Sequence, residues 1–277
     1  MLYRLVSLTD LIRTGSVRQR QAALAEVRAT VGGLRAADTP RSEDPSAAPQ
    51  VTPAAREAIS AIALCVQPLL GRVVFAGRAA AELLASEPVF RARFPEDASV
   101  TLLTSFALER MAGEMQTLGA ERVRRDGHTD VWRLPGGATA DLTHVETGAD
   151  TGSPWHEYAL LLTRDVEVAP SCSVRVSGGP ATAALLFDRH EGERLGTMSD
   201  SLALEDLILL VAGRPELAAE VRAAPAELRA YVAARSTALV RSGSAQGLVE
   251  HAAPDAAASP AMVDDIVQRL RRLSELA

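Results

Sequence analysis

Lysine is absent from the 277 residues of this chain, and all 29 basic side chains are arginines. Without a lysine amine the chain can form no lysine Schiff base. It also lacks the lysine that Walker-type nucleotide sites place on phosphate. The sequence therefore excludes both chemistries, although a GC-rich coding sequence is sufficient to explain the bias toward arginine.

Aromatic side chains and cysteines are also scarce. Aromatics form 4% of the chain, but hydrophobic residues form 47%, so a core built from Ala, Leu and Val is expected. The two cysteines, Cys65 and Cys172, are far apart and form no Cys-x-x-Cys motif. The sequence thus signals neither a thiolate zinc site nor a redox motif. Free thiols in a reducing cytoplasm are predicted, with a disulfide left open.

Long apolar runs are missing as well. The longest uncharged run, residues 58–71, is shorter than the about 20 residues that a membrane helix needs. Polar residues interrupt the N-terminus too early for a signal-peptide core. A soluble, cytoplasmic protein without a membrane partner is therefore predicted. The net charge of −6 disfavours non-specific binding to nucleic acid, but a local basic patch would permit it, so that partner is left undecided.

Composition divides the chain into four segments. Residues 1–37 carry apolar side chains at helical spacing and are predicted to form an N-terminal helical extension. Residues 38–52 are rich in Pro, Ser and acidic residues and form a linker. Residues 53–198 are predicted to be a core of strands and helices, and residues 199–277 a C-terminal helical region.

The pattern of short apolar runs and helical spacing predicts an α+β (α/β-like) fold, with a small mixed sheet and a C-terminal helical bundle. Strands are predicted at 72–76, 99–104, 131–134, 139–145 and 174–177. Helices are predicted at 53–68, 79–85, 106–118, from 180, and at 202–211, 216–223, 225–240 and 260–276.

A strand, a tight turn and a helix follow one another around Gly77 and Arg78. Backbone N–H groups at the start of such a helix point outward and attract phosphate. The same turn also serves packing alone in many αβ folds. Both interpretations remain open from the turn itself.

Two carboxylates stand at or within predicted strands. Asp97 precedes the strand 99–104, and Asp141 lies inside the strand 139–145. A carboxylate in an apolar strand needs a partner or a metal, and two on neighbouring strands can hold Mg²⁺. The alternative places Asp141 in solvent beside Thr139 and Thr143, which share its parity along the strand.

Other polar and aromatic residues are interpreted structurally. The five histidines (His128, His144, His156, His190 and His251) show no metal-ligand spacing such as His-x-x-x-His. They are treated as surface or core residues. Trp155 and Tyr158 could stack a base if exposed, but use in the core is favoured. Glu205 and Asp206 interrupt an apolar helix, and a solvated helix edge or a packing device is favoured over a structural ion pair or a substrate contact.

Several segments in order resemble a known family. They are 74–80 (VFAGRAA), 93–100 (RFPEDASV), 132–142, 155–160, 199–206 and, most clearly, 204–217 (LEDLILLVAGRPEL) with 224–231. Together they resemble bacterial nucleotidyltransferases of the AbiEii/AbiGii toxin type, over about residues 60–240. The resemblance implies a minimal polymerase-β-like core that binds NTP and Mg²⁺. It also implies a toxin–antitoxin context.

The resemblance assigns roles to a few positions and shows departures at most of them. Gly77 matches the first glycine of the phosphate turn, but Arg78 replaces the second. The Asp-x-Asp pair becomes Asp97 and Ser99, and Asp141 matches the third carboxylate. The later helix offers Arg189 about one turn beyond the expected basic position. The resemblance therefore implies catalytic and metal-binding roles for Asp97 and Asp141, with Gly77, Arg78, Ser99 and Arg189 around the nucleotide.

Three functions follow from these departures. The first is a catalytically impaired nucleotidyltransferase that still binds nucleotide, with weak Mg²⁺ affinity, because a hydroxyl is a poorer Mg²⁺ ligand than a carboxylate. The second is an active, divergent Mg²⁺-dependent transferase acting on RNA or protein. The third is a non-catalytic interaction module, in which residues 1–50 bind a protein partner such as an antitoxin.

Overall fold

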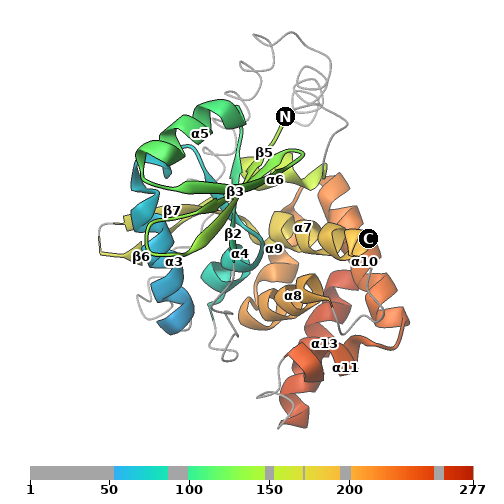
Figure 1. Cartoon of the computed structure of the whole chain (residues 1–277). Coiled ribbons are helices and arrows are strands. Elements are labelled where there is room, and N and C mark those ends of the chain that lie inside the picture. The colour runs from blue at the N-terminus through green and yellow to red at the C-terminus, as the bar shows by residue number, and fades with distance from the viewer. Residues whose placement is uncertain are drawn as a thin grey trace, which may run out of the picture. The chain divides into compact units, whose positions relative to one another are not determined.

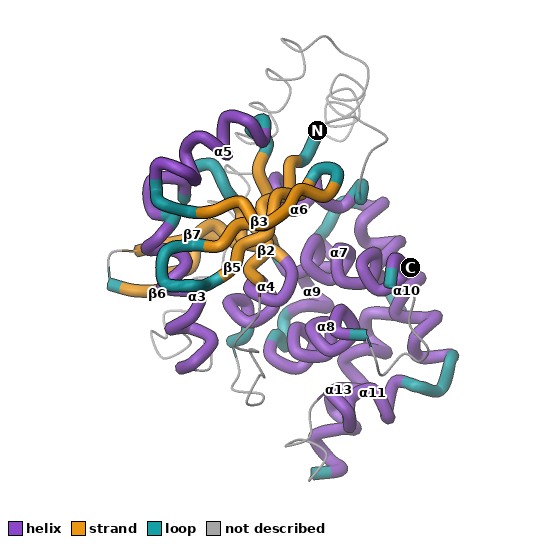
Figure 2. The backbone as a smooth tube through the Cα atoms, viewed as in Figure 1, coloured by secondary structure: helices purple, strands orange, loops and turns teal. Residues whose placement is uncertain are grey.

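The computed structural model describes residues 53–86, 99–146, 153–170, 172–193, 201–252 and 259–276 (Figures 1 and 2). The predicted N-terminal helix and the linker at 38–52 lie outside these residues. The chain divides into two compact units, and every described residue except Glu146 belongs to the larger one. The fold below is that of this larger unit.

A mixed sheet forms the centre of the unit (Figure 2). Its described strands are β1 (Val74–Ala76), β2 (Ser99–Thr104), β3 (Glu121–Asp126), β4 (Thr129–Arg133), β5 (Thr139–His144), β6 (Thr163–Ala169) and β7 (Cys172–Ser177). They lie in the order β3-β4-β5-β2-β1-β7-β6. The pairs β2–β5 and β1–β7 are parallel and the other neighbours are antiparallel.

Two edge strands were not predicted. All the predicted strands are present, with ends that differ by up to two residues, but β3 and β6 were absent from the prediction. Both are the outermost strands of the sheet. Edge strands commonly carry charged side chains, so the sequence of an edge strand lacks the apolar run that identifies a central strand.

One face of the sheet is covered by helices over its central strands. Alternate residues of the central strands, such as Phe75, Leu102 and Leu142, are no more than 1% exposed. They pack with helix α3 (Pro53–Cys65) and helix α5 (Leu108–Thr117), which Figure 1 shows on the same side of the sheet. The side chains that are buried between the sheet and helices α3 and α5 therefore lie on this face.

The opposite face is covered only in part. Helices α4 (Gly77–Leu84) and α6 (Trp155–Leu161) pack against β1, β2 and β7, with α7 (Gly179–Gly192) behind them (Figure 1). Under these helices Val74, Ala76 and Leu103 are buried. Farther across the sheet, on β2 and β5, the side chains of this face stay half-buried.

The C-terminal helices pack onto α4 and α7. They are α8 (Leu202–Gly213), α9 (Leu217–Ala223), α10 (Ala226–Arg241), α11 (Ala245–Ala252) and α13 (Pro260–Ser274). Four of these five were predicted, and α11 was not. The predicted class, a mixed sheet with a C-terminal helical bundle, is confirmed. None of the described helices has the length and hydrophobicity needed to cross a bilayer.

An arginine joins the end of α8 to the end of α4. Arg214 Nη1 donates a 2.8 Å hydrogen bond to the carbonyl of Leu84, and its Nε and Nη2 donate to Glu220 at 3.1 and 2.7 Å. Arg214 is 8% exposed, so its charge depends on these partners. The Gly-Arg-Pro-Glu-Leu segment at 213–217 is thus a structural connection between two helices.

Gly77 and Gly113 provide a matched pair of stability tests. Gly77 has φ +60°, and an added Cβ would lie 3.5 Å from Thr101 Oγ1, an ordinary contact. Gly77→Ala should therefore destabilise the fold through backbone strain alone, by about 1–2 kcal/mol. Gly113 lies inside α5 with nothing near a new Cβ. Gly113→Ala should stabilise the fold by about 0.5–1 kcal/mol.

The two free energies of unfolding would be measured by urea denaturation. The free energy of unfolding should decrease in Gly77→Ala and increase in Gly113→Ala. An unchanged or increased stability of Gly77→Ala would contradict the left-handed backbone at the start of α4.

Candidate functional site

The half-buried face of the sheet is polar where β2 and β5 meet. Ser99 pairs in register with Thr139, and Thr101 pairs with Asp141. Because residues two apart point to the same side of a strand, all four side chains share this face. All four are half-buried. The structure thus brings the predicted Ser99 and Asp141 to one patch. They are diagonal neighbours on adjacent strands, with Cα atoms about 8 Å apart.

Gly77 borders this patch from the end of β1. Ala76 pairs with Thr101, and the chain then turns into α4 at Gly77 with positive φ. The absence of a side chain leaves the backbone of the turn open beside Thr101 Oγ1, 3.5 Å from where a Cβ would stand. The first N–H groups of α4 are therefore close to the polar patch. This arrangement agrees with the predicted strand–turn–helix unit.

Arg78 is directed into the protein. Its Nη1 lies 3.5 Å from Asp206 Oδ1, and the two side chains are 16% and 4% exposed. Asp206 lies on α8, inside the helical region that packs on α4. A buried aspartate beside an arginine forms a structural ion pair, because each charge would be costly to bury alone. The favoured interpretation of Asp206 as part of a solvated helix edge is therefore wrong, and the alternative of a structural ion pair is confirmed.

Burial controls the protonation of the acids around Arg78. Burial raises the pKa of Asp206 to about 7, although the charges of Arg78 and Arg189 act to lower it. Burial likewise raises the pKa of Glu82 to about 7. The charge of Arg78 acts to lower this pKa, and the charge of Asp206 acts to raise it. Glu82 is 2% exposed, and its Oε1 has no hydrogen-bond partner among the described residues. The two acids of this cluster, Glu82 and Asp206, therefore change their protonation near neutral pH, beside the charge of Arg78.

Arg189 lies in the last turn of α7. Its Nε is 3.6 Å from Glu193 Oε1, and its side chain is 53% exposed. Its charge reaches Asp206, since it lowers the pKa of that carboxyl. Both arginines proposed for phosphate therefore act on Asp206. Asp97 lies outside the described residues.

The described residues do not fit a pair of Mg²⁺ ions. Two-metal sites need several carboxylates that share the two cations. On the polar patch, Asp141 is the one carboxylate among the described residues, and Ser99, Thr101 and Thr139 are neutral hydroxyls. The hydroxyl of Ser99 is buried without a hydrogen-bond partner. No catalytic step through two metals follows from this patch.

The other predicted structural residues take ordinary places. Trp155 is 9% exposed and stacks on Tyr231 with ring centroids 4.4 Å apart, so its use in the core is confirmed. Tyr158 donates its hydroxyl to Glu227 at 3.1 Å. Cys65 and Cys172 are both free thiols, and the disulfide that was left open is not formed.

Comparison with known proteins gives distant structural likenesses. No family model matches the chain, and no curated protein sequence matches it. JHP933 from Helicobacter pylori is similar over 82% of this chain and 91% of its own, with 11% identity and a TM-score of 0.44. An antigenic nucleotidyltransferase-like protein from Paracoccidioides brasiliensis is similar over 74% of this chain and 95% of its own, with 16% identity and a TM-score of 0.43. At such scores, function has to be argued from this chain's own residues.

The raised pKa of Glu82 predicts a pH-dependent stability. Between pH 4.5 and about 7 the folded chain holds a proton on Glu82 that the unfolded chain has released. Stability should therefore fall as pH rises through this window, by up to about 3 kcal/mol for this group. Glu82→Gln removes the titrating group, so the variant should lose less stability than the native chain between pH 5 and pH 8.

Thermal or urea unfolding at several pH values measures this difference. Glu250→Gln, at an exposed position on α11, is the matched control and should follow the native curve. Parallel pH curves for the native chain and Glu82→Gln would show that Glu82 does not carry the proton.

Proposed function

We propose that this chain is a nucleotidyltransferase-type protein, related to the AbiEii/AbiGii toxins, that has lost efficient nucleotidyl transfer. Its sequence segments follow the order of that family along residues 60–240. Its polar patch lies beside a glycine turn at the start of a helix. The proposed role is that of a pseudoenzyme, which keeps a polar surface beside a helix start on the transferase scaffold.

Ser99 carries the proposal. It stands at the first residue of β2, on the same face as Asp141, where the resemblance expects the second acid of an Asp-x-Asp pair. A hydroxyl brings no charge, and a change even in the outer shell of a metal site costs 10–100-fold in affinity or activity. The loss of a directly bound carboxylate should cost more. Mg²⁺ binding at this patch is therefore expected to be weak, with Asp97 and Asp141 as its remaining acids.

Arg78 supports the same conclusion. An arginine at this turn could bind phosphate through its guanidinium fork. However, its Nη1 is committed to Asp206, and its side chain is 16% exposed. To reach a nucleotide it would have to leave Asp206 unpaired in the core, which is unfavourable. Nucleotide contacts at this turn would thus fall to the backbone N–H groups of α4 and to the hydroxyls of Ser99 and Thr101.

A divergent active enzyme is the second candidate, and one observation favours it. Asp141 offers a carboxylate on the polar patch, and it pairs with Thr101, whose hydroxyl borders the Gly77 turn. A site with Asp97 and Asp141 would hold a single cation. This candidate requires Mg²⁺-dependent transfer of a nucleotide to RNA or protein, whereas the pseudoenzyme requires none.

Restoring the missing acid tests the proposal directly. Ser99→Asp places an aspartate on the face of Asp141, with the two Cα atoms about 8 Å apart, so that the two side chains can extend toward one cation between them. Mg²⁺-dependent NTP binding, measured by calorimetry, should become at least 10-fold tighter than in the native chain. Ser99→Asn has a similar size and no charge, and it should behave as the native chain does.

Transfer activity decides between the two candidates. Purified native protein, Asp97→Ala and Asp141→Ala would be incubated with Mg²⁺, each labelled NTP, and RNA or protein acceptors. The pseudoenzyme predicts no labelled product from the native chain. A labelled product that disappears in Asp141→Ala would overturn it and establish the divergent transferase.

A further inference from the structure

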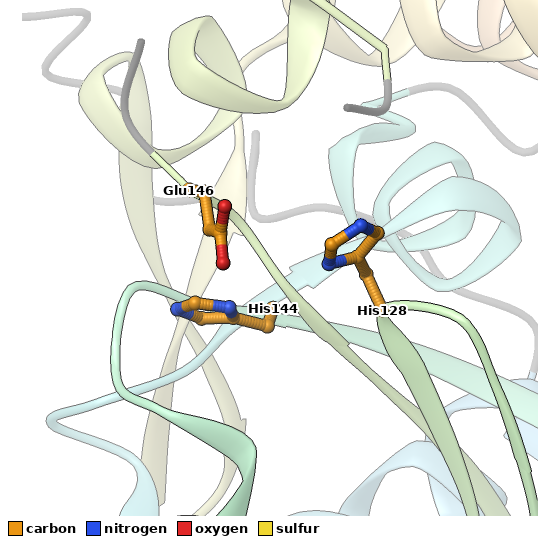
Figure 3. A group of neighbouring side chains, drawn as sticks. All are labelled: His128, His144 and Glu146. Atoms are coloured by element: carbon orange, nitrogen blue, oxygen red, sulfur yellow. The ribbon is translucent and has the colours of Figure 1, made fainter. Parts of the chain in front are cut away.

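Two histidines that are distant in sequence lie side by side in the fold. His128 is in the tight turn between β3 and β4, and His144 ends β5. Their ring nitrogens lie within 4.8 Å of each other (Figure 3). Glu146, two residues farther along the chain, is the third side chain labelled in that figure. The interpretation of these histidines as unrelated surface or core residues does not account for this proximity.

The strand pairing holds the two histidines together. The N–H of His144 donates a 2.8 Å hydrogen bond to the carbonyl of His128. One residue inward, Thr129 pairs with Thr143, and their hydroxyls are 3.0 Å apart. The two backbones are therefore fixed in register before any ligand binds. Such pre-organisation is what a metal site needs from its supporting elements.

We propose that His128 and His144 form a surface binding site for a divalent transition metal ion of the zinc type. Neutral imidazole nitrogens are good ligands for Zn²⁺, Ni²⁺ and Cu²⁺, and poor ones for Mg²⁺. Two nitrogens bound tetrahedrally to zinc at about 2.0–2.1 Å lie about 3.3 Å apart. Rotation of the exposed His128 side chain closes the remaining gap without movement of the strands. Water or further ligands complete the coordination.

This site is separate from the polar patch. His144 follows Asp141 by three residues on β5, so its side chain points to the opposite face of the sheet. The patch offers hydroxyl and carboxylate oxygens, which suit Mg²⁺, while the histidine pair offers nitrogens. The two sites therefore differ in metal preference, and the loss of one should leave the other intact.

Calorimetric titration of the chelator-treated, desalted full chain with ZnCl₂ tests the site. One Zn²⁺ should bind, and His128→Ala and His144→Ala should each weaken binding by more than 10-fold, since each removes a direct ligand. His251→Ala is the control, because His251 is an exposed histidine on α11, with its Nε2 3.4 Å from Glu205 Oε1. It should bind Zn²⁺ as the native chain does.

Co²⁺ absorption provides a second readout. Binding through imidazole nitrogens gives visible d–d bands, and these should disappear in both histidine variants and persist in His251→Ala. Native unfolding midpoints for the metal-free variants would show that each variant folds. Zn²⁺ affinity that is unchanged in His128→Ala and His144→Ala, or an absence of Zn²⁺ binding to the native chain, would overturn the site. Neither result bears on the Ser99 experiments.

Discussion

The buried ion pair between Arg78 and Asp206 constrains the rest of the structure. It joins the first turn of α4, directly after the central strand β1, to the middle of α8. At the other ends of the same helices, Arg214 bonds to the carbonyl of Leu84. Two arginines thus fix α8 along α4, and through α4 the C-terminal helices are fixed to the sheet. Removal of the acidic partner of either arginine would leave the charge of that arginine buried, without a counter-charge or solvent.

This constraint also explains the chemistry of the polar patch. The arginine that follows Gly77 serves the helix interface, so the turn keeps an open backbone and contributes no mobile cation. Ser99 contributes no charge either. The patch that remains is a set of hydroxyls with Asp141, which is suited to weak polar contacts and poorly suited to neutralising a triphosphate. The arginine that holds α8 to α4 is therefore directed away from the polar patch.

The sequence predicted the parts of the fold that have a strong local pattern. Interior strands such as β1 and β2 are rich in apolar residues, whereas the edge strands β3 and β6 are interrupted by charges. Of the site, the proximity of Ser99 and Asp141 followed from a family pattern. The partner of Arg78 could not be predicted, because Asp206 is more than 100 residues away and looks like any acid on a helix. The histidine pair was not predicted, because its proximity depends on the register between two strands, which only the fold determines. The spacing rule that was applied, His-x-x-x-His, describes two histidines on one helix.

The parallel pairing of β1 with β7 has a consequence for the order of folding. Phe75 pairs with Val176, and the intervening chain must be closed into a loop of about 100 residues before this ladder forms. The β2–β5 half of the sheet joins segments that are closer in sequence, so it can assemble first. Until β7 arrives, β1 presents an open hydrogen-bonding edge. In that order of assembly, an interior strand of the final sheet is an exposed edge until β7 is added, and chaperones or pairing with another chain would compete for it.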